Sequence, residues 1–491
     1  MTQPKVSYNP LYLQVKDVLL KRIVDGLYSP GQIIPSESKL AEDFGTSIST
    51  IRQAVSILVS DGILKKKQGR GTFVSEQKIR ISFLSWLPET KQGEKNLTEL
   101  INHFEKKNPT IEIEVIPTVY QKTKDHLLRL ITNGNAPDVA QIVSHWTSFY
   151  ASMGAFEPLD ELLDASNLAE RFEDKDMVGG IFQGKIYSVA WGLCPLSLIA
   201  NKNVLAEAGI HDLECPMTLF QFKEVCIKLT AFFGNSDKYA YGLNILHDET
   251  DFLRIYTFLQ AFGGGFINEK EEVIFNSAEN LAGFTWLRNF VSSIRILDTD
   301  IYTIRKRFSD NKVAFITDGP WIKYQMEELT GEPFDKNFMV VLNPVYHAAH
   351  SYSWNYNHAL AVCSQSQKKI YAAKFIDAIT NDEDLSNFYY QRSGHLPVNS
   401  SILEQEEYQT DFFHKFALQL NHSKCLNAKN PMFEKAMVLC MDAVRKLLFE
   451  QVEIKKELDE KEYYLNMLYY DNPMFSKIPL IFKKGGEAVE V

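Results

Sequence analysis

Tryptophans beside polar residues mark the long C-terminal part of this chain of 491 residues. The flat ring of a tryptophan packs against the apolar C–H face of a sugar, while the sugar hydroxyls need a few convergent hydrogen-bonding partners. Five of the six tryptophans lie at expected strand ends or loops, and a polar residue stands close to three of these five. The candidate ligand-binding residues are therefore Trp86, His145, Trp146, Trp191, Asp318, Trp321, Trp354 and Asn355.

Each of these roles has a simpler alternative. Tryptophan is commonly buried for packing alone, so any of the rings could belong to a hydrophobic core. Asp318 could instead cap the helix expected after Gly319 and Pro320. Trp321 and Trp354 are the preferred stacking candidates, and the sequence leaves both readings of Asp318 open.

A second group of chemically competent side chains, basic and small polar ones, gathers at the other end of the chain. Residues 1–75 carry ten Lys and Arg against six Asp and Glu, a net charge of +4, whereas the rest of the chain carries −14. Lys and Arg contact the phosphates of nucleic acids, so the basic part is expected to bind a polyanion that the acidic remainder repels. The candidate DNA-binding residues are Ser36, Ser47, Ser49, Thr50, Arg52, Gln53, Lys65, Lys67, Gly69, Arg70 and Gly71.

Three helices and a hairpin are expected to position the basic side chains. Apolar residues at helical spacing predict a first helix that ends near residue 25. Ser36 and Ser47 are expected to cap two further helices, which together form a helix-turn-helix. Arg52 and Gln53, on the exposed face of the third helix, could read bases in a major groove. Two short strands should then flank residues 68–71, whose glycines permit a tight, basic wing tip.

This N-terminal pattern resembles the GntR family of winged-helix regulators over about 70 residues. The resemblance implies a homodimer on a two-fold related double-stranded DNA operator, with the third helix in the major groove and the wing at the minor groove. The matching positions, in chain order, are Pro10-Leu-Tyr12, Gly26, Pro30-Gly31, Pro35-Ser-Glu37, Leu40-Ala41, Phe44-Gly45, Thr50-Ile-Arg52, Ala54, Leu58, Gly62 and Gly69-Arg-Gly-Thr-Phe-Val74.

Two positions depart from this family pattern. Members of the GntR family often carry arginine where this chain has Ser38 and Ile48, and they use both arginines for DNA contacts. Arg52 is retained. The operator sequence and affinity are therefore not implied by the resemblance.

The remaining 400 or so residues alternate strands and helices from residue 78 onward. Strands are expected at residues 78–85, 111–115 and 139–143, with amphipathic helices between them, and this alternation predicts a parallel sheet covered by helices. Ligands in such sheets sit beyond the carboxyl ends of the strands, where Trp86, His145 and Trp146 follow.

The order of these segments resembles that of bacterial extracellular solute-binding proteins of the carbohydrate-binding type along residues 79–470. The resemblance implies two α/β lobes joined by a hinge, with a sugar in the cleft between them. The landmarks are Ala136-Pro-Asp-Val139, Gly154-Ala-Phe-Glu-Pro-Leu159, Gly184-Lys-Ile-Tyr187, Asn201-Lys-Asn203, Ala208-Gly209, Ala261-Phe-Gly-Gly264, Gly319-Pro-Trp321 and Leu396-Pro-Val398. The proline usual after the Gly-Lys-Ile-Tyr strand is absent near Trp191.

The expected fold is thus multidomain: a winged helix-turn-helix of the α+β class, followed by a two-lobed α/β domain of the periplasmic-binding-protein type II. We expect the first domain at residues 1–77 and the second at residues 78–491. Lobe 1 is expected at about 78–190 and 310–380, and lobe 2 at about 195–309 and 381–491.

Composition sets limits on compartment and cofactors. No stretch of about 18 uncharged apolar residues occurs and the first ten residues lack a signal-peptide pattern, so we expect a cytoplasmic protein with no membrane partner. The six cysteines show no C-x-x-C spacing, which argues against a zinc site and a disulfide framework and favours reduced core thiols. No cofactor, metal or catalytic residue is expected, because no nucleophile array, carboxylate pair or metal-ligand spacing occurs.

Together the two parts predict a transcription regulator in which a small solute, a sugar or oligosaccharide, closes the two lobes and changes operator binding. Two alternatives remain. The first is a solute-binding protein whose N-terminal domain serves only for dimerisation or has lost DNA binding. The absence of arginine at positions 38 and 48 is compatible with this alternative. The second is a pyridoxal-phosphate enzyme of the aminotransferase type, which would need a Schiff-base lysine context that the sequence lacks.

Overall fold

The computed structural model describes residues 10–163, 178–245, 249–268, 270, 272–346, 352–398, 400–425, 430–470, 483–484 and 487–488. The outer ends of the two expected domains, at residues 1–9 and beyond 488, lie outside this description, as does the segment 164–177 of the expected first lobe. Within the described residues, no helix combines the length and the apolar character that crossing a membrane requires.

The N-terminal domain has the expected three helices and hairpin. The serine caps are confirmed: the Ser36 hydroxyl accepts a hydrogen bond from the Lys39 amide at 3.2 Å, and that of Ser47 accepts one from the Thr50 amide at 3.1 Å. One face of the third helix is buried and the opposite face, with Arg52, is exposed. The elements are α1 (Leu11–Val24), α2 (Glu37–Asp43), α3 (Ile48–Ser60), β1 (Leu64–Lys67) and β2 (Gly71–Val74).

The first lobe is built on a five-stranded sheet of order β4-β3-β5-β15-β8. Strands β3, β4 and β5 run parallel, as the βαβ pattern predicted, but β15 pairs antiparallel with both β5 and β8. The sheet is therefore mixed rather than wholly parallel. Its strands are β3 (Ile79–Ser85), β4 (Ile111–Pro117), β5 (Val139–Val143), β8 (Val189–Gly192) and β15 (His358–Val362), and its helices include α4 (Lys91–Lys107), α5 (Tyr120–Thr132), α6 (Thr147–Ser152), α16 (Lys369–Asn381) and α17 (Glu383–Ser393).

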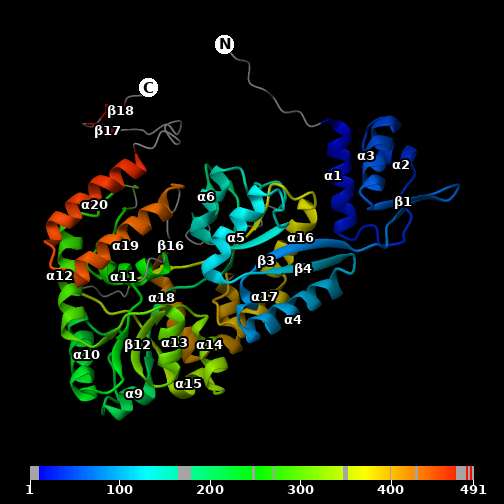
Figure 1. The fold of residues 1–491 in the computed structure, drawn as a ribbon. Coiled ribbons are helices and arrows are strands. Elements are labelled where there is room, and N and C mark those ends of the chain that lie inside the picture. The colour runs from blue at the N-terminus through cyan, green and yellow to red at the C-terminus, as the bar shows by residue number, and fades with distance from the viewer. Residues whose placement is uncertain are drawn as a thin grey trace.

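The second lobe has a five-stranded sheet of the order β11-β10-β12-β9-β13, again mixed in direction. The long C-terminal helices α19 and α20 pack on α11 and α12 at its side (Figure 1). The strands are β9 (Ser197–Asn201), β10 (Tyr239–Gly242), β11 (Ile296–Leu297), β12 (Val313–Asp318) and β13 (Phe338–Val341). The helices are α9 (Lys202–Glu207), α10 (Leu219–Phe233), α11 (Glu249–Ala261), α12 (Ala278–Ser293), α13 (Ile301–Ser309), α14 (Ile322–Thr330), α15 (Phe334–Asn337), α18 (Asp411–Asn421), α19 (Phe433–Phe449) and α20 (Ile454–Tyr469).

The sheet pairing corrects the expected division into lobes. Strands β12 and β13 both pair with β9, so the stretch 313–341 belongs to the second lobe and not to the first. Helix α17, expected in the second lobe, packs on α4 and α16 of the first. The expected division placed the second and third crossings too early in the chain, because the order of the segments does not show which strands pair with each other.

In the described chain, three segments cross between the lobes. They lie between β8 and β9, between β13 and β15, and between α17 and α18. The short strand β14 (Ser353–Asn355), which pairs with β16 (Ser423–Cys425), belongs to the second crossing. Crossings of this kind are the natural hinge of a two-lobed protein, because a few residues between rigid elements can absorb a change in backbone angles.

Within the described residues, the N-terminal domain packs closely on lobe 1. Helix α1 packs on α16, and Asp25 at the end of α1 lies 3.8 Å from Lys374 of α16. Helix α16 in turn packs on β15 and β8 of the lobe 1 sheet. In Figure 1 the N-terminal domain stands at the end of the molecule beside α16, away from lobe 2.

Trp191, a candidate stacking residue in the sequence, is instead part of the core of lobe 1. It lies in β8 with no exposed surface, and its ring stacks on that of Tyr389 in α17 with centroids 4.2 Å apart and planes at 10°. The alternation that placed it at a strand end could not show that α17 covers this face of the sheet.

We predict that Trp191→Ala destabilises lobe 1 by about 3–5 kcal/mol, because it removes a large buried ring and leaves a cavity. Trp191→Phe keeps an aromatic ring against Tyr389 and should cost clearly less. Urea unfolding of the full chain, followed by circular dichroism, measures both. An unchanged midpoint for Trp191→Ala would show that the ring does not stabilise the lobe.

Candidate ligand cleft and nucleic-acid interface

A cavity of about 250 Å³ lies between the two lobes. Residues that follow the carboxyl ends of strands form much of its wall, as expected for α/β sheets. Trp86 follows β3, Tyr120 opens α5 after β4, and Trp321 follows β12. The wall contains Trp86, Leu87, Glu89, Thr90, Tyr120, Gln121, Tyr356 and His358 beside lobe 1, and Arg254, Ile301, Tyr302, Arg305, Lys306, Trp321, Tyr324, Gln325, Glu328 and Leu329 of lobe 2.

Aromatic rings from both lobes meet in this cavity. The ring of Trp86 is perpendicular to those of Tyr120 and His358, at centroid distances of 5.4 and 5.0 Å. From the other lobe, Trp321 lies parallel to His358 at 5.6 Å, with the planes at 5°. The hydroxyls of Tyr120 and Tyr356 are hydrogen-bonded to each other. Flat apolar faces with hydroxyls at their edges suit a ligand that is itself partly apolar and partly polar.

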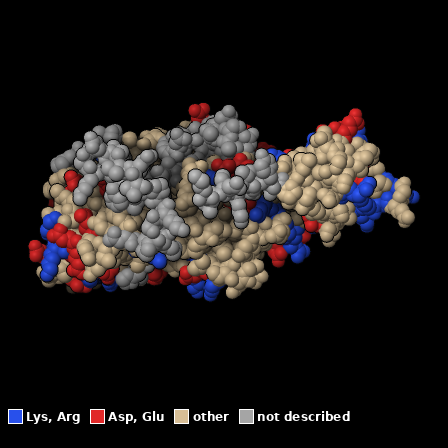
Figure 2. Space-filling model, turned by 90° about the horizontal axis from the view of Figure 1, so that it is seen from above, with Lys and Arg blue, Asp and Glu red and all other residues tan. Residues whose placement is uncertain are grey.

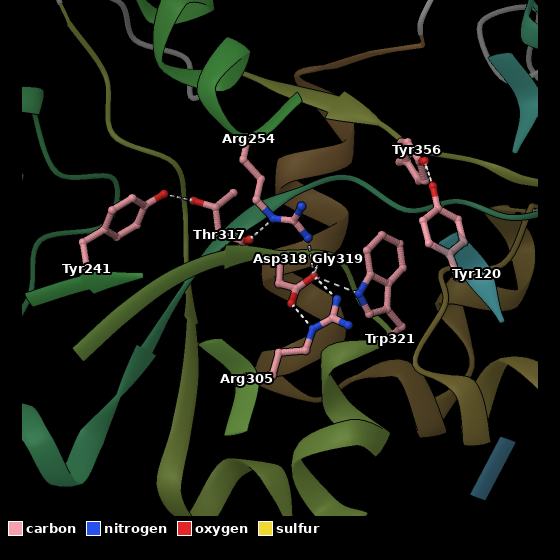
Figure 3. A network of polar contacts seen from close by, with 9 residues as sticks. All are labelled: Tyr120, Tyr241, Arg254, Arg305, Thr317, Asp318, Gly319, Trp321 and Tyr356. Atoms are coloured by element: carbon pink, nitrogen blue, oxygen red, sulfur yellow. Dashed lines mark hydrogen bonds and ion pairs between the residues drawn. The ribbon is translucent and has the colours of Figure 1, made fainter. Parts of the chain in front are cut away.

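A buried carboxylate holds the lobe 2 wall in place. Arg305 donates to Asp318 through Nε at 2.7 Å and Nη2 at 2.9 Å, a two-point pairing of the guanidinium with the carboxylate. Asp318 also accepts hydrogen bonds from the indole Nε1 of Trp321 at 2.8 Å and from the Gly319 amide at 2.9 Å. Arg254 approaches it at 3.4 Å. Figure 3 shows Trp321 between this carboxylate and the Tyr120–Tyr356 pair.

Asp318 therefore has a different role from either expected one. It has no exposed surface and does not line the cavity, so it does not present a carboxylate to a ligand, and helix α14 starts with Trp321 rather than Asp318 at its cap position. Burial alone would raise its pKa, but the charge and hydrogen bonds of Arg305, helped by Arg254, hold the pKa of Asp318 below its usual value. It stays ionised and positions Trp321.

Direct contacts also join the lobes at the mouth of the cleft. The hydroxyl of Tyr302 in α13 donates to Glu89 of lobe 1 at 2.5 Å, and the same carboxylate accepts from the Tyr120 amide at 3.1 Å. The Gln92 amide lies 3.5 Å from Glu328 of α14. These polar residues form a rim around the aromatic walls, where hydroxyl groups of a bound solute could replace the interlobe contacts.

Of the eight sequence candidates, only Trp86 and Trp321 line the described cavity. His145 and Trp146 are buried behind it in the turn after β5. Trp354 stacks on Tyr256 at 4.7 Å, and Asn355 accepts a hydrogen bond from the Cys194 amide at 2.8 Å, so both hold β14 in the crossing between the lobes. The preference for Trp354 as a ligand contact is therefore wrong for this cavity.

Sequence reasoning missed the tyrosines and His358. Tyr120 lies three residues after the end of β4, a strand that was expected, so the rule of strand carboxyl ends could have found it. Tyr302 and Tyr324 lie on helices of lobe 2, and His358 begins an antiparallel strand. No pattern in the sequence predicts that these three residues lie close together, because their proximity depends on how the two lobes face each other.

The exposed face of the N-terminal domain has the expected nucleic-acid character. Ser49, Arg52 and Gln53 are exposed on α3, and the wing presents a run of basic residues. A groove of about 590 Å³ separates the start of α2 and α3 from the wing. Figure 2 shows Lys and Arg side chains gathered at this outer end of the molecule. The wing residues are Lys65, Lys66, Lys67, Gly69, Arg70 and Gly71.

Arg52, the expected base-reading residue, is oriented by an ion pair. Its Nε donates to Glu37 at 2.9 Å, and Lys66 of the wing reaches the other oxygen of the same carboxylate at 3.0 Å. Glu37 thus ties the base-facing side of α3 to the wing. Ser36 and Ser47 act as caps, so their hydroxyls are engaged in the helix starts.

A family model described as bacterial extracellular solute-binding protein matches residues 99–414. The chain belongs to this family. A second model, described as bacterial regulatory proteins, gntR family, matches residues 11–74 and confirms the winged helix at the N-terminus. The fold is thus a GntR winged helix-turn-helix followed by a two-lobed solute-binding domain.

Known proteins resemble the two parts separately. The probable fructoselysine utilization operon transcriptional repressor of Escherichia coli (strain K12) is 43% identical over 81 residues, which are 16% of this chain and 33% of the repressor. The chain therefore spans about a third of the length of that relative.

Among solved structures, the GacH receptor of Streptomyces glaucescens, determined unliganded and with acarbose, has a TM-score of 0.71 at 18% identity, covering 81% of this chain and 100% of the receptor. A solute-binding protein from Thermotoga lettingae bound with alpha-D-tagatose has a TM-score of 0.71 at 19% identity, covering 80% of this chain and 100% of its own. At these identities the likeness shows the fold alone.

We predict that Asp318→Asn destabilises lobe 2 by about 3–5 kcal/mol, because it leaves the buried Arg305 guanidinium without its counter-charge. Asp310→Asn is the matched control: Asp310 forms an exposed pair with Lys306 at the end of α13, and its loss should cost about 0.5 kcal/mol or less. Thermal and urea unfolding of both variants test this. Equal stability of the two variants would contradict the role given to Asp318.

We predict that Arg52→Ala weakens specific operator binding by about 1–3 kcal/mol, the value of a two-point contact with guanine. Glu37→Gln removes the carboxylate that orients Arg52 and with it one negative charge, so it should lower the preference for operator over unrelated DNA without weakening general DNA binding. Gel shifts on DNA upstream of the protein's own gene measure both. Lys106→Ala, an exposed basic residue on α4, is the control, and an unchanged affinity for Arg52→Ala would refute the contact.

Proposed function

We propose that this protein is a ligand-responsive transcription regulator that binds an operator through its winged helix and a sugar or oligosaccharide in the cleft. The observation that most strongly supports this proposal is the aromatic cavity, which is lined by Trp86 and Tyr120 from one lobe and by Trp321 from the other. The winged helix rests on the lobe that supplies Trp86 and Tyr120. A solute that touches both walls therefore has a physical route to the DNA-binding domain.

Carbohydrate is the ligand class that suits the cleft chemistry. Indole and phenol rings offer flat apolar faces, while Glu89, Gln121, Gln325 and Glu328 provide hydrogen-bonding groups at the rim. The likeness to the receptor solved with acarbose and to the protein bound with tagatose supports the same class. A repressor named for fructoselysine utilization carries a similar winged helix, which agrees with control of sugar-derived catabolism.

Closure of the cleft supplies the regulatory step. A ligand that binds both walls favours the arrangement in which they face each other, and only this difference in affinity between open and closed lobes can alter DNA binding. The contact of α16 with α1 carries the change to the winged helix. A coupling of about 1–3 kcal/mol would change operator affinity by about 5- to 150-fold.

The proposal includes a homodimer acting in the cytoplasm, where operator DNA is found. A two-fold operator requires two winged helices, and the spacing of its half-sites would be set by how two copies associate. Movement of lobe 2 relative to lobe 1 could then change the distance or mobility of the paired winged helices.

We expect Trp86→Ala and Trp321→Ala each to weaken sugar binding at least about 10-fold, equivalent to about 1.4 kcal/mol, because each removes one aromatic wall of the cavity. Trp286→Phe is the matched control, since Trp286 packs on Phe290 within lobe 2, away from the cleft. A thermal-shift screen of mono- and oligosaccharides identifies the ligand, and calorimetry gives its affinity for each variant.

Operator binding is measured by gel shift with and without that ligand in the same variants. The ligand should shift operator affinity of the unaltered protein and of Trp286→Phe, but not of the two alanine variants at the same concentration. A sugar that binds without any effect on operator affinity would contradict the sensor function. Absence of any DNA binding would favour the alternative in which the N-terminal domain serves only for dimerisation.

A further inference from the structure

A cysteine and two histidines meet in the hinge, next to the cleft. Cys194 lies in the crossing from β8 to β9, His358 opens β15 at the end of the second crossing, and His395 lies in the crossing after α17. One atom from each side chain, the cysteine sulfur or a ring nitrogen, can be chosen so that all lie within 4.8 Å of one another. The cluster therefore draws one residue from each of the three described crossings.

The surrounding structure holds these groups close together and buried. Cys194 and His395 have no exposed surface and His358 is 5% exposed. The two imidazole rings lie 4.5 Å apart between centroids. Gly192 makes room for this, since a side chain at that position would meet the His395 ring at 3.1 Å. Paired hydrogen bonds between Leu193 and Leu396, of 3.0 and 3.1 Å, fix the two backbones on either side.

Several nitrogen atoms of this cluster lack a hydrogen-bond partner in the described structure. They are Nδ1 of His358 and both Nδ1 and Nε2 of His395. An unsatisfied buried polar group typically costs about 1–3 kcal/mol, so three of them in one place call for an explanation. Stacking of His395 on Tyr389, at 5.5 Å, accounts for the ring face but not for the ring nitrogens.

We propose that Cys194, His358 and His395 bind a zinc ion. Two imidazoles and one thiolate are ligands that zinc accepts in a tetrahedral site, with bonds of about 2.0–2.1 Å to nitrogen and about 2.3 Å to sulfur. Those bond lengths place the ligand atoms about 3.3–3.7 Å apart, so the side chains need to approach by about 1 Å on binding. Cys194 loses its proton to solvent and the zinc bonds to the resulting thiolate.

The position of the cluster would place the zinc ion in the hinge, next to the cleft. Three protein ligands leave the fourth tetrahedral position for water or for a group of the bound solute. His358 also lines the cleft cavity and lies parallel to Trp321, so the ion would sit directly behind the aromatic wall. Because its ligands come from all three crossings, bound zinc would restrict the hinge. This inference stands independently of whether the cleft binds sugar.

The test uses the full-length protein, freed of metal with a chelator and titrated with Co²⁺ as a spectroscopic stand-in for zinc. We expect one equivalent to bind with thiolate-to-cobalt charge-transfer absorption and the visible bands of tetrahedral cobalt, and stoichiometric Zn²⁺ to abolish both. C194S should lose the charge-transfer band, and H395Q should weaken cobalt and zinc binding at least about 100-fold, since removing a direct ligand should cost at least as much as the roughly 10- to 100-fold that loss of an outer-shell partner costs. C215S, which alters an exposed cysteine elsewhere, should behave like the unaltered protein.

A second readout covers the case in which a buried substitution disturbs folding. Zn²⁺ should raise the melting temperature of the metal-free unaltered protein and of C215S, but not that of H395Q. Absence of a charge-transfer band, its persistence in C194S, its loss in C215S, or no effect of Zn²⁺ on the melting temperature would each overturn the proposal. Tight binding of copper(I) by the same residues without zinc binding would also overturn the assignment to zinc.

Discussion

The carboxylate of Asp318 is the fixed point on which the cleft depends. It is fully buried at the end of β12, and the paired donors of Arg305 and the indole nitrogen of Trp321 converge on it. An unpaired charge at this depth would be costly, so the chain keeps the carboxylate and the guanidinium together. Their pairing sets the orientation of Trp321, which then faces the lobe 1 rings across the cavity. A single electrostatic constraint thus decides where one wall of the cleft stands.

The two lobes depend on each other through the segments that cross between them. The Asn355 side chain accepts a hydrogen bond from the Cys194 amide at 2.8 Å, and the backbones of Leu193 and Leu396 are hydrogen-bonded to each other. The three crossings are therefore joined by hydrogen bonds into one unit. The aromatic walls are attached to rigid elements on either side of this unit. In the proposed closure, motion of the lobes would be concentrated in a few residues, the same place where the Cys194, His358 and His395 side chains meet. Ligand in the cleft and an ion in the hinge would act on the same movement.

The winged helix is placed where the proposed movement of the lobes would reach it. Helix α1 rests on α16, which packs on two strands of the lobe 1 sheet, and one of these, β15, begins with His358 at the cavity. The path from the cleft to the DNA-binding domain therefore runs through packed secondary structure rather than a free linker. At the far end, Glu37 joins Arg52 of the recognition helix to Lys66 of the wing, so the DNA-contacting parts are oriented together.

Local patterns in the sequence were sufficient for many of the elements, and the kind of protein followed from the resemblance to two known families. Serine caps at positions 36 and 47, glycines in the wing and the apolar periodicity of α3 specify the winged helix, because caps and turns depend on near neighbours in the chain. The βαβ alternation likewise indicated the first strands of lobe 1. Strand ends gave Trp86 and Trp321 as cleft residues, since ligands gather at the carboxyl ends of strands.

Only the tertiary structure decided which strands share a sheet and which rings face the cleft. Trp191 and Trp354 looked like binding residues but are covered by Tyr389 and Tyr256, and the pairing of β12 with β9 moved a whole segment to the other lobe. His358 and His395 had no spacing that suggested a shared site. By itself the sequence determined a basic helix-turn-helix with a wing joined to an acidic α/β body, because these follow from local periodicity and charge, while the two lobes were implied by the resemblance to solute-binding proteins. The cleft wall and the hinge cluster arise from contacts between residues far apart in the chain, which only folding brings together.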